Sequence, residues 1–217
     1  MTGLVIFDCD GVLVDSEPIA LRLLLETLAG AGLAMDAETA NARFLGRSLA
    51  SMRAILAEDH GLTLSDAALE EMRGRLYAAF RAELRPVPGV AEALTGLGRA
   101  FCVASSSQPE RIERSLRVTG LWPFFEGRMF SATQVARGKP APDLFLYAAR
   151  SMGYAPAACL VVEDSPAGIA AAQAAGMRVV AFTGGSHAGN EAHRAAIAAL
   201  APDAVIDDMR RLVTLVA

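Results

Sequence analysis

The sequence has few cysteines, no excess of basic residues and no long hydrophobic run. Its three cysteines, Cys9, Cys102 and Cys159, are odd in number and lack the spacing of metal ligands. We therefore expect free thiols in a reducing, cytoplasmic environment. Lys and Arg total 20 against 24 Asp and Glu, and the net charge of −4 offers no electrostatic surface to nucleic acid or to an anionic membrane.

Membrane-spanning and leader segments are not expected either. The Ala-rich stretch between Asp164 and Arg178 is too short to cross a bilayer, and it contains Pro166 and Gly168. Asp8 follows a short apolar run with no basic leader before it, a pattern that does not fit a signal peptide. Hydrophobic residues nevertheless make up 53% of the chain, which indicates a folded protein.

Short apolar runs alternate with helical patterns along most of the chain. The runs have strand length and are rich in β-branched or aromatic residues; they cover residues 4–7, 101–104, 160–162, 179–182 and 204–206. Helical spacing of apolar residues separates them, over 112–118, 144–152 and 169–175. This alternation predicts an α/β fold, a Rossmann-like, doubly wound parallel sheet covered by helices on both faces.

Residues 16–84 break the alternation, because they contain only helical patterns. The clearest is a long helix whose apolar residues recur every three or four positions: Leu69, Met72, Leu76, Phe80 and Leu84. The segment is too long for one crossover helix. We therefore predict a catalytic core formed by residues 1–15 and 85–217 and an inserted helical cap formed by residues 16–84, which closes as a lid about hinges near 14–16 and 85–87.

The end of the first predicted strand carries two acids two residues apart, Asp8 and Asp10, followed by Gly11. In an open α/β sheet, ligands bind outside the carboxyl ends of the strands. The two carboxylates would repel each other there unless a cation lay between them or their pKa values were displaced. By itself the segment leaves a second interpretation open, an ordinary solvated acidic turn.

The second predicted strand is followed by polar residues at the start of a helix: Ser105, Ser106, Ser107 and Gln108. Their hydroxyl and backbone N–H groups form an anion site, cap the helix, or do both. Further along the chain, Lys139 stands between Gly138 and Pro140. The restricted backbone there suits the aiming of one charge, although a surface lysine is the simpler interpretation.

Another strand end carries a second pair of acids, Glu163 and Asp164, for which helix capping is the alternative interpretation. Taken together, the four segments follow apolar strands with acids, hydroxyl groups and one lysine. Mg²⁺ favours oxygen ligands from one or two carboxylates together with phosphate and water. The sequence therefore predicts a site for Mg²⁺ and a phosphate group at one edge of the sheet.

The order and spacing of these segments resemble the four motifs of the haloacid dehalogenase (HAD) superfamily. Residues 8–17 match the first motif, Ser105 the second, Lys139 the third, and Glu163 with Asp164 the fourth. The insertion after the first motif resembles the helical cap of the subgroup that holds β-phosphoglucomutase and phosphoglycolate phosphatase. The resemblance covers essentially the whole chain.

This resemblance implies a role for each acid. Asp8 is the nucleophile that forms an aspartyl-phosphate, and Asp10 is the general acid and base. Mg²⁺ is held by the Asp8 carboxylate, the Asp10 carbonyl oxygen and Asp164. Glu163 belongs to the same metal site, either as a direct ligand or, as we favour, through a water molecule or behind the ligands.

The resemblance also implies which groups bind the substrate. Ser105, the N–H of Ser106 and Lys139 hold the phosphoryl oxygens, and Gln108 lines the pocket beside them. In the predicted cap, Arg47 binds an anionic or polyol group, or it is a solvated loop arginine.

The implied reaction is hydrolysis of a small phosphorylated metabolite, sugar-like or sugar-acid-like, by a monomer or weak homodimer. Phosphomutases of the subgroup carry a histidine where this chain has Ala20 and a basic residue near Leu49. A β-phosphoglucomutase-like phosphotransferase and a phosphoacceptor receiver domain are the alternatives. Glu17 faces the cleft or favours the start of a cap helix, and the position of His187 relative to the site is left open.

Overall fold

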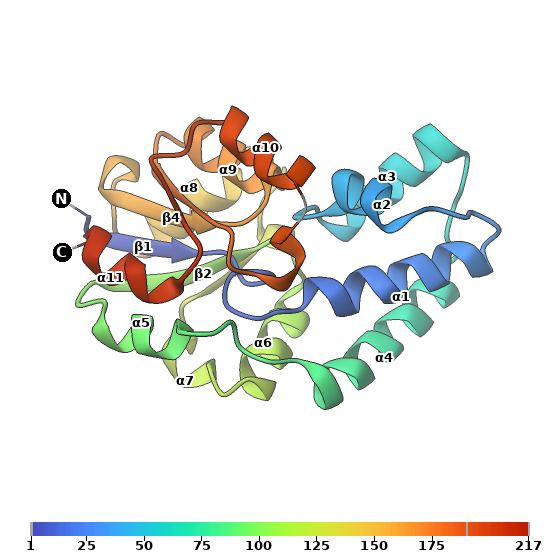
Figure 1. Cartoon of the computed structure of the whole chain (residues 1–217), viewed down its shortest axis with the longest axis horizontal. Helices are drawn as coiled ribbons and strands as arrows, with labels where there is room; N and C mark the ends of the chain where they lie inside the picture. The colour runs from blue at the N-terminus through green and yellow to red at the C-terminus, as the bar shows by residue number, and fades with distance from the viewer. Residues whose placement is uncertain (1, 190, 217) are drawn as a thin grey trace.

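Figure 1 shows the computed structural model of the chain, which describes residues 2–189 and 191–216. Within these residues, six parallel strands form one sheet in the order β3-β2-β1-β4-β5-β6. The strands are β1 (Leu4–Phe7), β2 (Ala100–Ser105), β3 (Met129–Ser131), β4 (Cys159–Glu163), β5 (Arg178–Phe182) and β6 (Ala204–Ile206). The predicted α/β fold with a parallel sheet is confirmed.

The five strands predicted from apolar runs are β1, β2, β4, β5 and β6. The strand β3 was not predicted, because its sequence Met-Phe-Ser has no β-branched residue and ends on a polar one, whereas the equally short β6 reads Ala-Val-Ile. This strand is defined by its neighbour: residues 129–131 pair in register with residues 103–105 of β2. The central position of β1, between β2 and β4, brings the first and fourth predicted motif segments side by side.

Alternate side chains of β1 pack against the two helical layers of the core. Val5 and Phe7 belong to an apolar cluster with α5 (Val90–Gly96), α6 (Pro109–Val118), α7 (Trp122–Phe125) and α11 (Leu212–Val216). Leu4 and Ile6 belong to a second cluster with α8 (Asp143–Ser151), α9 (Pro166–Ala174) and α10 (Glu191–Ala199). All four side chains are fully buried, as expected for a parallel sheet covered on both faces.

Four consecutive helices follow β1 and extend beyond the carboxyl ends of the strands (Figure 1). They are α1 (Glu17–Gly30), α2 (Ala37–Phe44), α3 (Leu49–His60) and α4 (Asp66–Glu83). They share an apolar cluster of their own: Leu24, Leu28, Ala40, Phe44, Met52, Leu56, Leu64 and Leu69. Whether these helices move as one body against the sheet stays a prediction.

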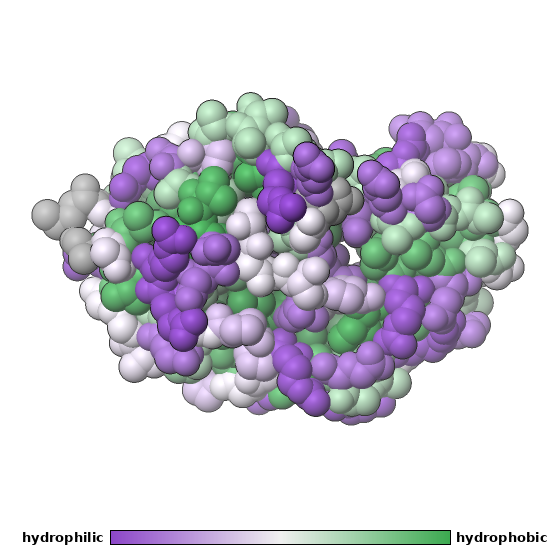
Figure 2. All heavy atoms as spheres, viewed as in Figure 1, coloured by the Kyte–Doolittle hydropathy of each residue, from purple (hydrophilic) through white to green (hydrophobic). Residues whose placement is uncertain are grey.

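The two chain segments that join the helices to the sheet lie side by side. The Asp15 N–H donates to the Arg85 carbonyl, and the Val87 N–H donates to the Leu13 carbonyl, both at 3.0 Å. The surface is hollowed between the sheet region and the helices (Figure 2). Across residues 2–189 and 191–216, no helix combines the length and the apolar character that a membrane crossing requires.

Candidate active site

Asp8 and Lys139 form a buried ion pair where β1 meets β4. The Asp8 N–H donates to the Val162 carbonyl at 3.0 Å and so extends the pairing of the two strands. Lys139 Nζ donates to Asp8 Oδ1 at 2.7 Å and to Glu163 Oε1 at 2.5 Å. The side chains of Asp8, Lys139 and Glu163 are only 6%, 1% and 0% exposed, so the structure brings three predicted site residues together away from water.

Glu163 is hydrogen-bonded on both carboxylate oxygens. Lys139 occupies Oε1, while the Ser165 N–H and hydroxyl donate to Oε2 at 2.8 and 2.9 Å. Gly168 leaves room for this carboxylate, because a Cβ there would lie 1.9 Å from Oε1. Both oxygens are thus occupied by protein donors, which suits a residue that lies behind a ligand sphere better than one that binds an ion directly.

The charges of this cluster do not balance. Burial raises the pKa of Asp8 well above its usual range and also raises the pKa of Glu163, because water cannot solvate the ionised carboxylates. Burial alone would lower the pKa of Lys139, but its attraction to the two carboxylates outweighs this effect and raises it. A single ammonium group faces several buried acids, and an added cation would stabilise their ionised forms.

Asp164 completes an acidic cluster that fits a divalent ion. Asp8, Glu163 and Asp164 each offer a carboxylate oxygen, and these oxygens lie within 4.8 Å of one another. Asp164 Oδ2 is buried and lies 2.7 Å from His187 Nε2. Buried carboxylate oxygens are the hard ligands that Mg²⁺ takes in proteins.

His187 lies next to this cluster, which answers a question that the sequence left open. Its Nε2 lies 2.7 Å from Asp164 Oδ2, a distance that forms an ion pair when the ring is protonated. Burial opposes protonation of the ring, but Asp164 and Glu17 outweigh that effect and raise the pKa of His187 to about 9. Gly11 permits the close approach, because a Cβ there would lie 2.0 Å from Asp164 Oδ2.

Asp10 belongs to a separate hydrogen-bond network. Its Oδ1 accepts from the Ser16 hydroxyl at 2.6 Å and from Arg111 Nη2 at 2.7 Å, and its Oδ2 accepts from the Ser107 hydroxyl at 2.6 Å. Burial alone would raise the pKa of Asp10, but the Arg111 guanidinium and the two hydroxyl donors outweigh burial and lower it. Asp10 is therefore held as a carboxylate.

The polar residues after β2 form a turn at the start of α6. The buried Ser105 hydroxyl accepts from the Ser107 N–H at 3.1 Å. The Ser106 hydroxyl donates at 2.9 Å to the carbonyl of Gly46, in the loop between α2 and α3. Gly46 also lies against Ser165, whose Oγ would be 2.2 Å from a Cβ at that position. The loop between α2 and α3 therefore touches the ends of both β2 and β4.

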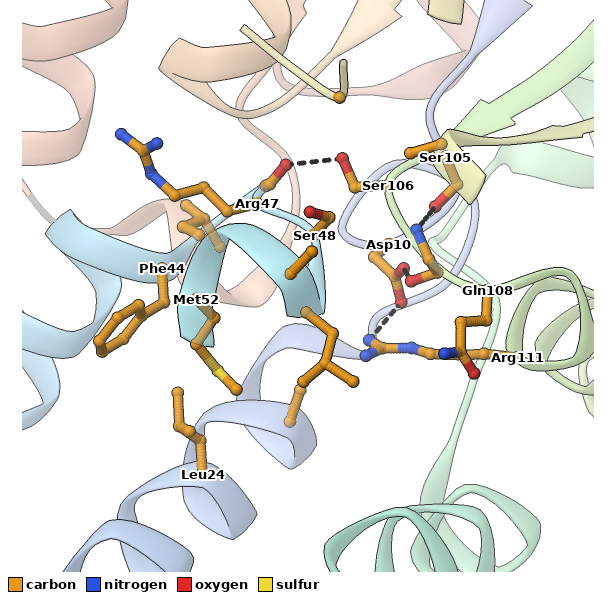
Figure 3. A pocket seen from close by; sticks show the side chains of 18 of the residues that line it. Asp10, Leu24, Phe44, Arg47, Ser48, Met52, Ser105, Ser106, Gln108 and Arg111 are labelled. Atoms are coloured by element: carbon orange, nitrogen blue, oxygen red, sulfur yellow. Dashed lines mark hydrogen bonds and ion pairs between the residues drawn. The ribbon is translucent and has the colours of Figure 1, made fainter. Parts of the chain in front are cut away.

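A cavity of about 740 Å³ separates the sheet edge from helices α1–α4 (Figure 3). Its lining includes Asp8, Asp10 and the predicted binding residues Ser105, Ser106, Gln108 and Arg47. Apolar side chains of the helices line the opposite side, among them Leu24, Phe44 and Met52. The volume lies in the range of small-molecule sites.

The predicted site residues reach this cavity to different degrees. Arg47 lines it, but in Figure 3 its guanidinium points away from Asp10. Lys139, Glu163 and Asp164 are buried and lie behind the lining residues. The first and fourth predicted motif segments therefore meet beneath the cavity, whereas Arg47 approaches it from the helices.

Arg111 was not predicted as a site residue, although the sequence carries a signal for it. Arg111 follows Gln108 by three residues, and residues three apart lie on the same side of a helix. Because α6 begins at the site, its first turn presents Arg111 in the same direction as Gln108. The contact with Asp10 spans 101 residues of sequence, so only the folded chain reveals it.

Known proteins resemble this chain over most of its length. A family model described as haloacid dehalogenase-like hydrolase matches residues 2–176. The 6-phosphogluconate phosphatase of Escherichia coli (strain K12) is 32% identical over 184 residues, which cover 84% of this chain and 83% of that protein. Hexitol phosphatase A of the same strain is 36% identical over 183 residues, which cover 81% of each chain.

Solved structures resemble it as well. A conserved haloacid dehalogenase-like protein of unknown function from Agrobacterium tumefaciens str. C58 is 35% identical to this chain. The TM-score is 0.84, and the match covers 100% of this chain and 98% of the other.

Proposed function

Because the chain belongs to the haloacid dehalogenase-like hydrolases, we propose that it is a Mg²⁺-dependent phosphatase acting on a small sugar- or sugar-acid-like phosphate monoester. The observation that carries the proposal is the buried Asp8–Lys139–Glu163 cluster, which lies with Asp164 beneath a cavity of about 740 Å³. The names of two relatives, 6-phosphogluconate phosphatase and hexitol phosphatase A, support phosphorylated sugar derivatives as substrates.

Asp8 is the proposed nucleophile. Lys139 binds Oδ1 and orients the carboxylate, which leaves Oδ2 as the atom that attacks phosphorus. A bond forms between Oδ2 and phosphorus while the bond from phosphorus to the leaving oxygen breaks. A water molecule then attacks the phosphorus of the aspartyl-phosphate, releases inorganic phosphate and restores the Asp8 carboxylate.

Asp10 is the proposed general acid and base. As a carboxylate it first takes up a proton from solvent water when the substrate enters the cavity. It gives this proton to the leaving oxygen in the first step and takes one from the attacking water in the second. All three of its observed partners donate to it, so one contact has to be given up before the carboxyl group turns toward the leaving oxygen.

The cation and the phosphoryl group are proposed to share the sheet edge. The Asp8 carboxylate, the Asp10 carbonyl oxygen and Asp164 would hold Mg²⁺, with Glu163 behind them. When bound, the ion supplies positive charge that stabilises the phosphoryl oxygens. Ser105, the Ser106 N–H and Lys139 would hold those oxygens from the other side. The acids and serines come from strand ends and the turns that follow them, whereas Lys139 comes from the segment before α8.

Residues 16–84 are proposed to act as a cap that closes over the site and excludes water. The Ser106 hydroxyl bonded to the Gly46 carbonyl supports this, because it joins the cap loop to the turn after β2. Ala20 lines the cavity and carries no group that transfers a proton, which favours hydrolysis over mutase chemistry. The buried, free cysteines support a reducing, cytoplasmic location.

The test is release of inorganic phosphate from a panel containing 6-phosphogluconate and hexitol phosphates, with Mg²⁺ or with a chelator. We expect many turnovers per chain with Mg²⁺ and none in chelator. Asp8→Asn should lower kcat by about 10³-fold or more, because the nucleophile is lost. Asp143→Asn, at a half-buried acid paired with the exposed Arg137 near Lys139, should change it little. Release that stops at one phosphate per chain, or an Asp8→Asn variant that retains most activity, contradicts the proposal.

A further inference from the structure

Arg111 is a positively charged residue of the cavity that the proposed mechanism leaves unused. It lies in the first turn of α6, and its side chain is 23% exposed. Nη2 donates to Asp10 Oδ1 (Figure 3). The guanidinium carbon lies 5.5 Å from the centre of the Phe80 ring. The ring, the helix and the carboxylate together hold the guanidinium at the cavity wall.

The observed contact does not satisfy the guanidinium. Arg111 Nε is buried and has no hydrogen-bond partner among the described residues. A guanidinium prefers to bind a carboxylate through two parallel N–H groups, and a buried donor without an acceptor is costly. Asp10 cannot provide the second contact, because Ser16 and Ser107 hold its two oxygens in their present orientation.

The proposed reaction would leave Arg111 with fewer hydrogen-bond acceptors still. When Asp10 turns toward the leaving oxygen, Arg111 loses its carboxylate partner. An unpaired, largely buried cation is strongly unfavourable, so another anion has to take the place of Asp10. The group displaced is a carboxylate, and a carboxylate on the substrate would replace it with the same geometry and charge.

Other cations of the cavity are less suited to this role. Four arginines line it among the described residues: Arg47, Arg53, Arg73 and Arg111. Arg53 and Arg73 each lie next to an exposed acid of the helices. The Arg47 guanidinium points away from Asp10 in Figure 3, whereas Arg111 points at it. Arg111 is therefore the lining arginine placed beside the proposed acid.

We infer that Arg111 binds a carboxylate carried by the leaving group of the substrate, and that this contact releases Asp10 to reach the leaving oxygen. The inference rests on the proposed function, since it takes Asp10 as the acid. It narrows the substrate class to sugar-acid phosphates and disfavours neutral polyol phosphates. Arg111 then acts twice, as a specificity-determining residue for the substrate and as a positioning residue for Asp10.

The test compares two ligands that differ only at one terminal carbon, 6-phosphogluconate and the corresponding hexitol 6-phosphate. Calorimetry in Mg²⁺ with the Asp8→Asn protein measures binding without turnover. We expect the acid to bind about 10- to 100-fold more tightly than the hexitol phosphate. Adding Arg111→Gln should reduce this ratio to about one, and adding Arg111→Lys should keep part of it, because the charge remains.

A matched control lies on the same helix. Arg114 pairs with Glu110 on the exposed side of α6 and does not line the cavity. Arg114→Gln removes the same charge and should leave the binding ratio unchanged. In otherwise wild-type protein, Arg111→Gln should lower kcat for the acid more than for the hexitol phosphate, whereas damage to the fold would lower both equally.

The outcomes separate the two proposals. Equal binding of the two ligands, no binding of the acid, or a loss in Arg111→Gln that is the same for both would overturn the role of Arg111. A wild-type protein that binds the acid through Arg111 but releases no phosphate would instead overturn the proposed function.

Discussion

Asp8 and Asp10 are two residues apart, yet they belong to networks of different construction. Lys139 and Glu163 contact Asp8 in a cluster that is at most 6% exposed, and of these three residues only Asp8 lines the cavity. Asp10 binds Arg111, and those two side chains are 11% and 23% exposed at the wall itself. A buried strand end fixes the first network, whereas a turn and the first turn of a helix form the second.

This difference indicates that the Asp8 and Asp10 networks have different roles. The Asp8 network is closely packed, because the side chains of Asp8, Lys139 and Glu163 are all buried and hydrogen-bonded to one another. The Asp10 network holds the proposed acid as a carboxylate and leaves a buried guanidinium nitrogen without an acceptor. We expect the Asp8 network to act in the same way on any phosphate ester. We expect the contacts of the Asp10 network to depend on the chemical group that the bound ester carries.

Removal of the cation of the Asp8 network should have the largest effect on the rate and on the stability of the protein. Lys139→Met should lower kcat by about 10²- to 10³-fold, because the proposed nucleophile and phosphoryl oxygens lose a buried charge. It should also lower the free energy of unfolding in chelator by about 3 kcal/mol, since buried carboxylates are left unpaired. Phosphate release and urea unfolding measure these effects.

The control for this variant is Arg137→Met, two residues earlier, where the side chain is 71% exposed. Its rate and stability should stay near wild type, because exposed ion pairs contribute little. A Lys139→Met protein with wild-type turnover would show that the buried pair is structural only.

A smaller effect is expected in the Asp10 network. Ser107→Ala removes one donor from Asp10 Oδ2 and should lower kcat by about tenfold, because a single hydrogen bond to a charged group is lost. Ser115→Ala is the matched control on α6, since that buried hydroxyl has no partner among the described residues. If Ser107→Ala costs as much as Lys139→Met, the two networks do not differ in the way described.

The smallest effect concerns Glu17, which lines the cavity beside the Asp10 network. Burial, with Asp10 and Asp164 nearby, raises the pKa of Glu17 from 4.5 to about 7. The folded protein keeps a proton that the unfolded chain loses near pH 4.5, so stability falls as the pH rises from about 4.5 to 7.

Glu17→Gln keeps this side chain neutral at every pH. In chelator the variant should be about 1 kcal/mol more stable than wild type at pH 8, a modest gain because Glu17 is partly exposed. The two proteins should be equally stable at pH 4. Urea unfolding at both pH values provides the measurement, and a gain of the same size at pH 4 would rule out this explanation.

Local signals were sufficient for the regular part of the fold. The apolar runs that became β1, β2, β4, β5 and β6 consist of apolar, mostly β-branched or aromatic residues, which indicate strands in isolation. The sequence of β3, Met-Phe-Ser, carries no such signal, and only pairing with β2 defines this strand. The helices after β1 could be predicted from local spacing, because α4 repeats apolar residues every three or four positions from Leu69 to Phe80.

Some residues of the candidate site could likewise be placed from the sequence, and others could not. Asp8 and Glu163 could be placed together from the sequence, because each ends an apolar strand and parallel strands share an edge. His187 could not be placed, since it lies in a short turn whose direction depends on the packing around Gly11 and Asp164. Arg47 was expected at the cavity and lines it, but the direction of its side chain depends on the packing of the loop between α2 and α3.

By itself, the sequence determined the parallel sheet, the helices after β1 and the acids at the strand ends, because periodic burial and strand termini are local properties of the chain. Only the tertiary structure decided that Arg111 faces Asp10 and leaves a donor open, and that Lys139 is shared between Asp8 and Glu163. Those contacts join residues 24 to 131 positions apart, and no local pattern encodes such a distance.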